Sequence, residues 1–279
     1  MLTPAEDYEE DWSALEADYR RLFGERVTFR RWTDPGELAG FNRVSPLIAW
    51  GYQRDCPLWF ALLDRMEREN ITVCNPVPIL RWNSDKSYLA ELDAANVATV
   101  PTLVAAALDQ AALDQARDEF GTDILVIKPP VSGGADGTFR LAARDSLPMS
   151  VAGQRMMIQP FLPSIATEGE YSLFYFGGEF SHSIIKRPAA GDFRVQDQFG
   201  GYEEAVEAPA AANALADAAL AATANITGTG TLAYSRVDML RDGNGQFRLM
   251  ELELIEPSLF LRFAPDGGAA FAKALLSSG

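Results

Sequence analysis

Three acidic residues near the end of the sequence fall on two segments that both alternate polar and apolar side chains. Asp238 lies in the segment at 234–240, and Glu251 and Glu253 lie in the segment at 246–254. Alternation with a period of two predicts β-strands, in which residues two apart share a face. Like charges this close repel one another, so the pattern indicates a bound divalent cation. Carboxylates on the wet face of an ordinary hairpin are the alternative.

The sequence DGNG at 242–245 separates the two segments and predicts a tight turn. Pairing about this turn puts Asp238 roughly opposite Glu251 and brings Arg236 onto the same face. The other face is expected to be buried, and it carries Val237, Met239, Met250, Leu252 and Leu254.

Two lysines precede features that suit an anion. Lys128 ends an apolar strand and leads into a glycine-rich loop that contains Ser132, Gly133 and Gly134. Glycines let backbone N–H groups approach a phosphate, and the ammonium adds a point charge; a plain hairpin loop is the alternative. Lys86 stands before an apolar helical segment, whose N-terminal dipole favours an anion; a solvated lysine is the alternative.

The strand at 156–159 stops at a proline, and its unpaired main-chain groups could bond a planar heterocycle between Met157 and Phe161. An edge strand that ends for structural reasons is equally plausible. Glu168 and Glu170 begin the next strand, where a carboxylate could accept hydrogen bonds from ribose hydroxyls. For Glu168, simple surface exposure is the alternative.

A positive cluster at 186–194 begins with Lys186 and ends with Arg194 in an otherwise acidic chain. Such cations could clamp a phosphoryl group in transfer, and a solvated loop with salt bridges is the alternative. His182 is the only histidine, which removes histidine-based zinc sites, and a structural role is favoured for it over general-base catalysis. The sequence offers no Cys/His/Asp set for covalent catalysis.

The overall composition narrows the classes of function. The net charge of −15 argues against a nucleic-acid partner, because phosphate backbones require a basic surface. Neither a signal peptide nor a membrane-spanning run is recognisable, and the two cysteines, Cys56 and Cys74, have no metal-binding spacing. We therefore expect a cytoplasmic protein without a membrane partner. A homodimer is the default oligomer.

The 279 residues allow two or three subdomains. Helix and strand patterns alternate over the first hundred residues, with strands expected at 27–32 and 47–50, which predicts a small parallel α/β unit. An alanine-rich helix at 104–120, a dense β region, a second alanine-rich helix at 209–225 and the acidic hairpin follow.

The order of these motifs from about Arg81 to Phe263 resembles the ATP-grasp superfamily. Glutathione synthetase-type ATP-binding domains and the O-ureido-serine cyclo-ligases of cycloserine biosynthesis are the most similar members. The most specific phrases are NSDK at 83–86, GDFRV at 191–195 and MELELIEPS at 250–258. The resemblance implies an α/β chain, α+β in its ATP-grasp part, with an N-terminal domain at 1–95, a small ATP-grasp subdomain at 96–162 and a C-terminal subdomain with the metal site at 163–279.

The resemblance also assigns roles to the candidate residues. It implies that ATP is bound by Lys86, Lys128, the loop Ser132, Gly133 and Gly134, the adenine hinge Gln159, Phe161 and Leu162, and Glu168 or Glu170. It implies catalytic cations at Arg236, Arg194 and Lys186. It implies Mg²⁺, with Mn²⁺ as an alternative, on Asp238, Glu251 and Glu253. Many relatives carry Asn at the position of Glu253, so this carboxylate could instead contact a substrate amino group.

The activity implied by the resemblance is that of an ATP-dependent carboxylate–amine ligase. It would form an amide-type C–N bond through an acyl-phosphate and release ADP and phosphate. An intramolecular cyclo-ligase acting on a ureido or amino-acid substrate is one alternative, and a nucleotide-binding protein without turnover is another. The substrate is expected to be small and amino-acid-like, selected by the N-terminal unit and by loops around Trp50, Tyr52 and Arg54. A place in the core or at an interface is an equal alternative for Trp50 and Tyr52.

Overall fold

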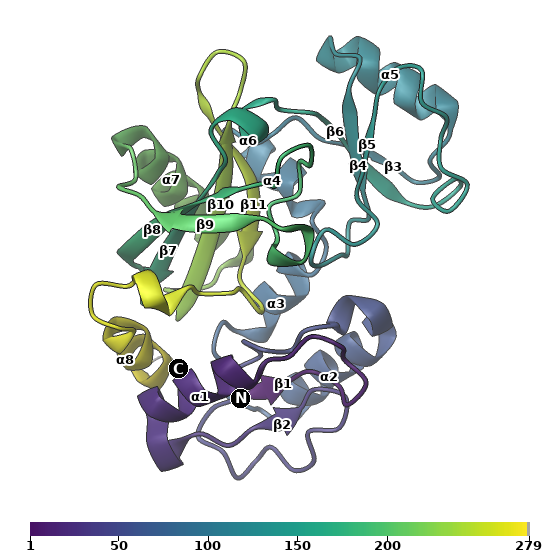
Figure 1. Cartoon of the computed structure of the whole chain (residues 1–279). Helices are drawn as coiled ribbons and strands as arrows, with labels where there is room; N and C mark the ends of the chain where they lie inside the picture. Colours follow the sequence, from purple (N-terminus) through teal and green to yellow (C-terminus); the bar gives the residue numbers. More distant parts are fainter. Residues whose placement is uncertain (278–279) are drawn as a thin grey trace.

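The computed structural model describes residues 1–277 and has three parts that meet around the acidic hairpin (Figure 1). The N-terminal part begins with a parallel pair of very short strands. The elements of the first hundred residues are β1 (Leu2–Thr3), α1 (Ser13–Phe23), β2 (Arg30–Arg31), α2 (Cys56–Arg68), α3 (Val77–Asn83) and α4 (Tyr88–Ala94).

The N-terminal unit has the expected parallel α/β character but much less strand than the sequence predicts. Only Arg30 and Arg31 of the expected strand at 27–32 pair with β1. Residues 47–49 form a buried turn rather than a strand, in which the amide of Ala49 donates to the carbonyl of Pro46. Their apolar side chains fill a core instead of a sheet, a distinction that an apolar run of four residues does not carry.

The second part is a four-stranded antiparallel sheet with the order β3-β6-β4-β5, covered by helix α5 (Figure 1). Its elements are β3 (Leu103–Ala105), α5 (Gln110–Phe120), β4 (Leu125–Lys128), β5 (Phe139–Leu141) and β6 (Met156–Pro160). The helix expected from 104 starts only at Gln110, because Asp109 caps it by accepting from the amide of Ala112 at 2.8 Å. The residues before the cap pair with β6 instead.

The third part is a five-stranded antiparallel sheet with the order β11-β10-β7-β8-β9. Its elements are α6 (Ser164–Thr167), β7 (Glu170–Phe176), β8 (Glu179–Arg187), β9 (Tyr202–Ala205), α7 (Ala210–Thr227), β10 (Tyr234–Arg241), β11 (Phe247–Glu253) and α8 (Ala269–Ser277). The small side chains of Ala212, Ala216 and Ala219 let α7 pack closely on one face of this sheet. The opposite face is turned toward the other two parts.

The hairpin of β10 and β11 has the expected register, with Asp238 opposite Glu251 and Arg236 opposite Glu253. The pairing then skips one residue, because Met239 lies opposite Leu249. Met250 is therefore the extra residue of a β-bulge and leaves the buried face on which we expected it. Its side chain packs near Phe161 instead.

Side chains from the first part hold the outer edge of β11, which would otherwise expose unpaired main-chain groups. The Tyr88 hydroxyl accepts from the amide of Leu252 at 2.7 Å and donates to its carbonyl at 3.0 Å. The Asn83 amide donates to the same carbonyl and accepts from the amide of Leu254, both at 2.9 Å. These four contacts fix the strand that carries Glu251 and Glu253.

The two ends of the described chain lie side by side, where α8 packs on α1 (Figure 1). Tyr19 and Phe23 of α1 share an aromatic core with Phe271 of α8. Helices α3 and α4 pack on the five-stranded sheet, although they precede the expected boundary at 95. The domain limits at 95 and 162 stay predictions. Over residues 1–277, no helix has both the length and the apolar character needed to cross a membrane.

Candidate active site

A cavity of about 810 Å³ opens where the three parts meet. It is lined by the glycine-rich loop after β4, the end of β6, the loop between β8 and β9, the acidic hairpin and two segments of the N-terminal part. Nearly all of the residues predicted to form the site line this cavity, and the two exceptions are Asp238 and Glu168.

Three of the four lysines in the sequence lie at this cavity, although lysine is usually a surface residue. Lys86, Lys128 and Lys186 are each less than a tenth exposed. Lys86 donates to the main-chain carbonyl of Ser132 and lies 3.3 Å from both the Ser132 hydroxyl and a carboxylate oxygen of Glu251. It thereby ties the glycine-rich loop to the hairpin.

Lys128 differs from the other two because its ammonium has no ion pair or hydrogen bond within residues 1–277. Burial lowers its pKa, and the nearby Glu251 opposes that shift. A buried cation without a partner at a cavity wall is suited to an anionic ligand. In the same loop, Gly133 passes so close to Gln53 that a Cβ atom would lie 3.0 Å from its amide nitrogen.

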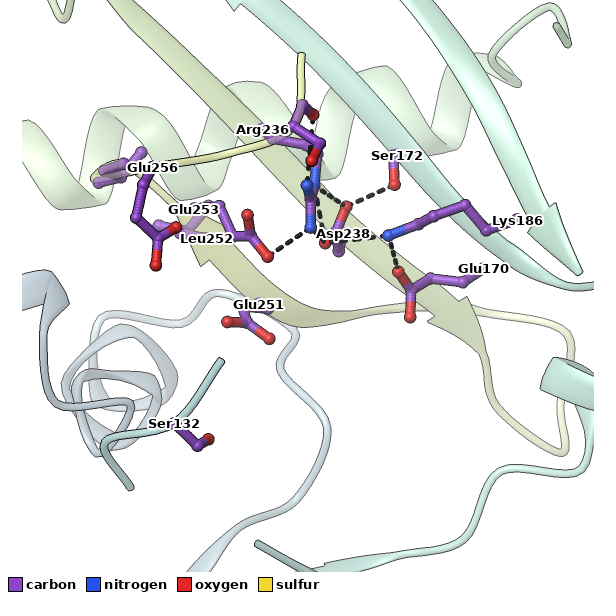
Figure 2. A network of polar contacts seen from close by, with 12 residues as sticks. Ser132, Glu170, Ser172, Lys186, Arg236, Asp238, Glu251, Leu252, Glu253 and Glu256 are labelled. Carbon is purple, nitrogen blue, oxygen red and sulfur yellow. Dashed lines mark hydrogen bonds and ion pairs between the residues drawn. The ribbon is translucent and has the colours of Figure 1, made fainter. Parts of the chain in front are cut away.

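The hairpin carries a buried network of charges (Figure 2). Asp238 is at its centre, 2.9 Å from Arg236 and 3.4 Å from Lys186, and accepts from the Ser172 hydroxyl at 2.5 Å. Lys186 also pairs with Glu170, and Arg236 also pairs with Glu253. Burial alone would raise the pKa of Asp238, but Arg236 and Lys186 lower it to about 2. Asp238 therefore stays ionised as the counter-ion of both cations.

The three predicted metal ligands occupy different environments. Within residues 1–277, no three acidic, histidine or cysteine side chains form a group that could hold a metal ion. The carboxylate of Asp238 is engaged in ion pairs with its two cations, whereas Glu251 and Glu253 line the cavity. Burial raises the pKa of Glu253 to about 7, against the effect of Arg236 and helped by Glu251. Two carboxylates at one cavity wall fit Mg²⁺ chemically, and the three-ligand assignment stays a prediction.

The residues predicted to bind the base lie together at the other sheet. Gln159 points its amide at Thr102, to which it donates at 2.8 Å. Phe161 and Leu162 line the cavity and form an apolar cluster with Met250. Glu170 also lines it, but Glu168 does not, because its carboxylate is taken up by Tyr171 and Arg241.

Arg194 lines the cavity from the loop between β8 and β9, and is about one third exposed. Asp192 pairs with its guanidinium at 2.7 Å, and the ring of Phe199 lies 3.6 Å beneath it. The side chain is thus held in place from two directions, although it belongs to a loop.

Sequence reasoning did not single out Glu256 or Tyr8 as cavity residues, whereas it placed Trp50 and Tyr52 in loops expected to select the substrate. Tyr8, Trp50 and Tyr52 line the cavity together with Glu256. Burial, with help from Glu253, raises the pKa of the Glu256 carboxyl to about 8. An acidic residue among apolar neighbours, at 254–257 directly after a strand, is the one sequence signal that could have found it.

Comparison with known proteins identifies this arrangement. No family model matches the sequence. The crystal structure of D-cycloserine synthetase DcsG superposes with a TM-score of 0.82 at 29% identity, covering 98% of this chain and 97% of that one. The cycloserine biosynthesis protein DcsG of Streptomyces lavendulae is 34% identical over 213 residues, which cover 72% of this chain and 71% of that protein. The chain belongs to the ATP-grasp family of ligases.

Other ATP-grasp ligases are more distant. Glutathione synthetase of Prochlorococcus marinus (strain MIT 9313) is 31% identical over 155 residues, covering 52% of this chain and 47% of that protein. The ATP-grasp ligase PsnB, in a crystal structure with Mg and ADP, has a TM-score of 0.55 at 22% identity and covers 81% of this chain and 69% of that one. The expected fold and family are confirmed, and the protein is an enzyme, an ATP-dependent ligase.

Proposed function

We propose that this ligase activates a substrate carboxylate as an acyl-phosphate and joins it to a nitrogen nucleophile, releasing ADP and phosphate. The observation that carries the proposal is the unpaired, buried ammonium of Lys128 beside Lys86 and Arg236 in one cavity. A triphosphate needs such cations to offset the negative charge of its phosphates.

The residues divide the work by their surroundings. Lys86 and Lys128 are placed to bind nucleotide phosphates, while Gln159, Phe161 and Leu162 offer a slot for the base. Arg236 is fixed by Asp238, Glu253 and the carbonyl of Ser258, so its one remaining N–H group can stabilise the oxyanion that forms when nitrogen attacks the acyl carbon. No protein nucleophile is needed in this reaction.

A divalent cation fits this scheme at Glu251 and Glu253. Mg²⁺ is the natural choice for carboxylate and phosphate oxygens, and Mn²⁺ shares these ligands. When bound, the ion supplies neutralisation of charge on the phosphates. Asp238 would join the ligands only by giving up an ion pair with Arg236 or Lys186.

Ring closure within one substrate is the form of the reaction that we favour over joining two molecules. The match that supports this choice is D-cycloserine synthetase, because it extends over nearly the whole of both chains and includes the N-terminal part. We therefore infer a small amino-acid-like substrate whose carboxylate and nitrogen nucleophile are both within it. We place the activity in the cytoplasm, where ATP is made, and both cysteines are free thiols.

An isotope experiment tests the chemistry. The enzyme is incubated with ATP, Mg²⁺ and O-ureido-serine, or pairs of amino acids, and ADP release is measured. A substrate labelled with ¹⁸O in its carboxylate is expected to transfer one labelled oxygen to the released phosphate. ADP release that needs only one organic substrate supports ring closure. Phosphate without label would contradict an acyl-phosphate, and a strict need for two substrates would contradict ring closure.

A further inference from the structure

Glu256 stands apart from the other carboxylates drawn in Figure 2. Glu170, Asp238, Glu251 and Glu253 each form an ion pair with a lysine or arginine. Within residues 1–277, no ion pair or hydrogen bond engages the carboxylate of Glu256. A carboxyl group in a cavity without a partner is available to a cationic ligand, which favours its ionised form.

Two hydrogen bonds hold the main chain that carries this carboxylate. The indole N–H of Trp50 donates to the carbonyl of Glu256 at 3.3 Å, and the Tyr234 hydroxyl donates to the carbonyl of Ile255 at 2.7 Å. The side chain of Glu256 extends from this main chain and lines the cavity. Its surroundings are asymmetric, with Glu253 and Glu251 adding negative potential and Lys86 and Arg236 opposing it.

The chemistry of the surroundings favours an organic cation over a metal ion. Glu256 does not combine with its acidic neighbours into a group that could hold a metal, among the residues that the structure describes. Three aromatic side chains of the cavity wall are close enough to Glu256 to bond its main chain or feel its charge, namely Tyr8, Trp50 and Tyr52, and the ring of Tyr8 already carries the guanidinium of Arg54 at 4.9 Å. Ring faces attract ammonium groups and contribute nothing to the coordination of Mg²⁺.

We propose that Glu256 binds the ammonium group of the amino-acid-like substrate and so makes the enzyme selective for substrates that carry one. The inference deepens the proposed function and rests on it. Arg236 acts electrostatically on Glu256, so an ammonium held there stays close to the cation that we assign to the reacting carboxyl group. The subsite combines a hairpin residue with walls from the N-terminal part, which gives that part a role in substrate choice.

A pair of probes that differ only in the amino group tests this role without turnover. D-cycloserine carries the amino group, and isoxazolidin-3-one is the same ring without it. Binding of each is measured by calorimetry with ADP and Mg²⁺ present, for the wild type and for Glu256→Gln. The wild type is expected to bind cycloserine at least about 10-fold more tightly, as a charge-assisted contact requires. Glu256→Gln is expected to bind the two probes about equally.

Glu10→Gln is the matched control, because it removes one negative charge from the mouth of the same cavity. It is expected to keep the preference of the wild type. A wild type without a preference, or a preference that survives in Glu256→Gln, would overturn the proposal. The ADP affinity of Glu256→Gln, expected to be unchanged, verifies that the variant is folded. Because binding is read without catalysis, this result is independent of the isotope test above.

Discussion

Individual charges in the cavity are informative when they lack a partner. Most are paired within the protein, as Arg236 is with Asp238 and Glu253. The ion pair is the reason that such a charge can be buried. Lys128 and Glu256 have no such explanation. One buried cation and one partly buried carboxyl group without partners indicate ligands that carry both signs of charge, as an amino acid together with a nucleotide does.

Lys128→Ala tests the cationic half of this reasoning. The affinity for ADP is expected to fall by about 10- to 100-fold, since a charge-assisted contact with phosphate is lost. Calorimetric titration with ADP and Mg²⁺ measures the effect. Lys273→Ala serves as the control, because Lys273 is the one lysine remote from the cavity and is exposed on α8. Equal ADP affinity in the two variants would remove Lys128 from the nucleotide site.

At the scale of elements, the hairpin shows what a sequence pattern can and cannot specify. The period of two, with DGNG between the segments, was enough to predict that Asp238 lies opposite Glu251, as the register confirms. The bulge at Met250 was not predictable, because one inserted residue leaves the alternation on each side intact. The ion pairs of Asp238 were not predictable either, because they depend on Lys186 from another strand.

The position of Asp238 in the network leads to a prediction about stability. Asp238→Asn leaves Lys186 and Arg236 with one carboxylate fewer in a buried site, so the free energy of unfolding is expected to fall by about 3 kcal/mol. Glu204→Gln removes the same charge from a largely exposed pair with Arg187 on the same sheet, and is expected to cost less than about 1 kcal/mol. Urea titration of both variants measures the difference. Equal losses would mean that Asp238 is not the structural counter-ion described above.

At the scale of the molecule, the strongly patterned C-terminal elements were predicted better than the N-terminal part. The helix expected at 209–225 is found as α7 at Ala210–Thr227, whereas the expected strands at 27–32 and 47–50 are mostly or wholly absent. Short apolar runs in the N-terminal part take their conformation from tertiary packing. The role of Asn83 also could not be predicted from the sequence, since its hydrogen bonds join α3 to β11 across 169 and 171 positions.

A titratable side chain, His182, lies beside the aromatic core in which the two chain ends pack on the five-stranded sheet. His182 of β8 stacks on Phe174 with ring centroids 4.3 Å apart, and its Nε2 lies 3.1 Å from the carbonyl of Leu259. Burial lowers its pKa to about 4, although the carbonyls of Leu259 and Phe260 and the charge of Asp266 oppose the shift. The folded protein therefore resists protonating a residue that the unfolded chain protonates near pH 6.5.

This difference makes stability depend on pH in a defined direction. Above pH 6.5 both states are neutral at His182 and its contribution is complete. As pH falls from 6.5 to 4 only the unfolded state gains the proton, so the free energy of unfolding is expected to drop by up to about 3 kcal/mol. His182→Gln lacks the titrating ring and should lose less stability over the same range. Urea unfolding of both proteins at several pH values between 7 and 4 isolates the contribution of His182 to the free energy of unfolding, because the other titrating groups are common to both. Parallel curves would show that the imidazole is protonated as easily in the fold as outside it, and that the aromatic core joining the chain ends is open to water at β8.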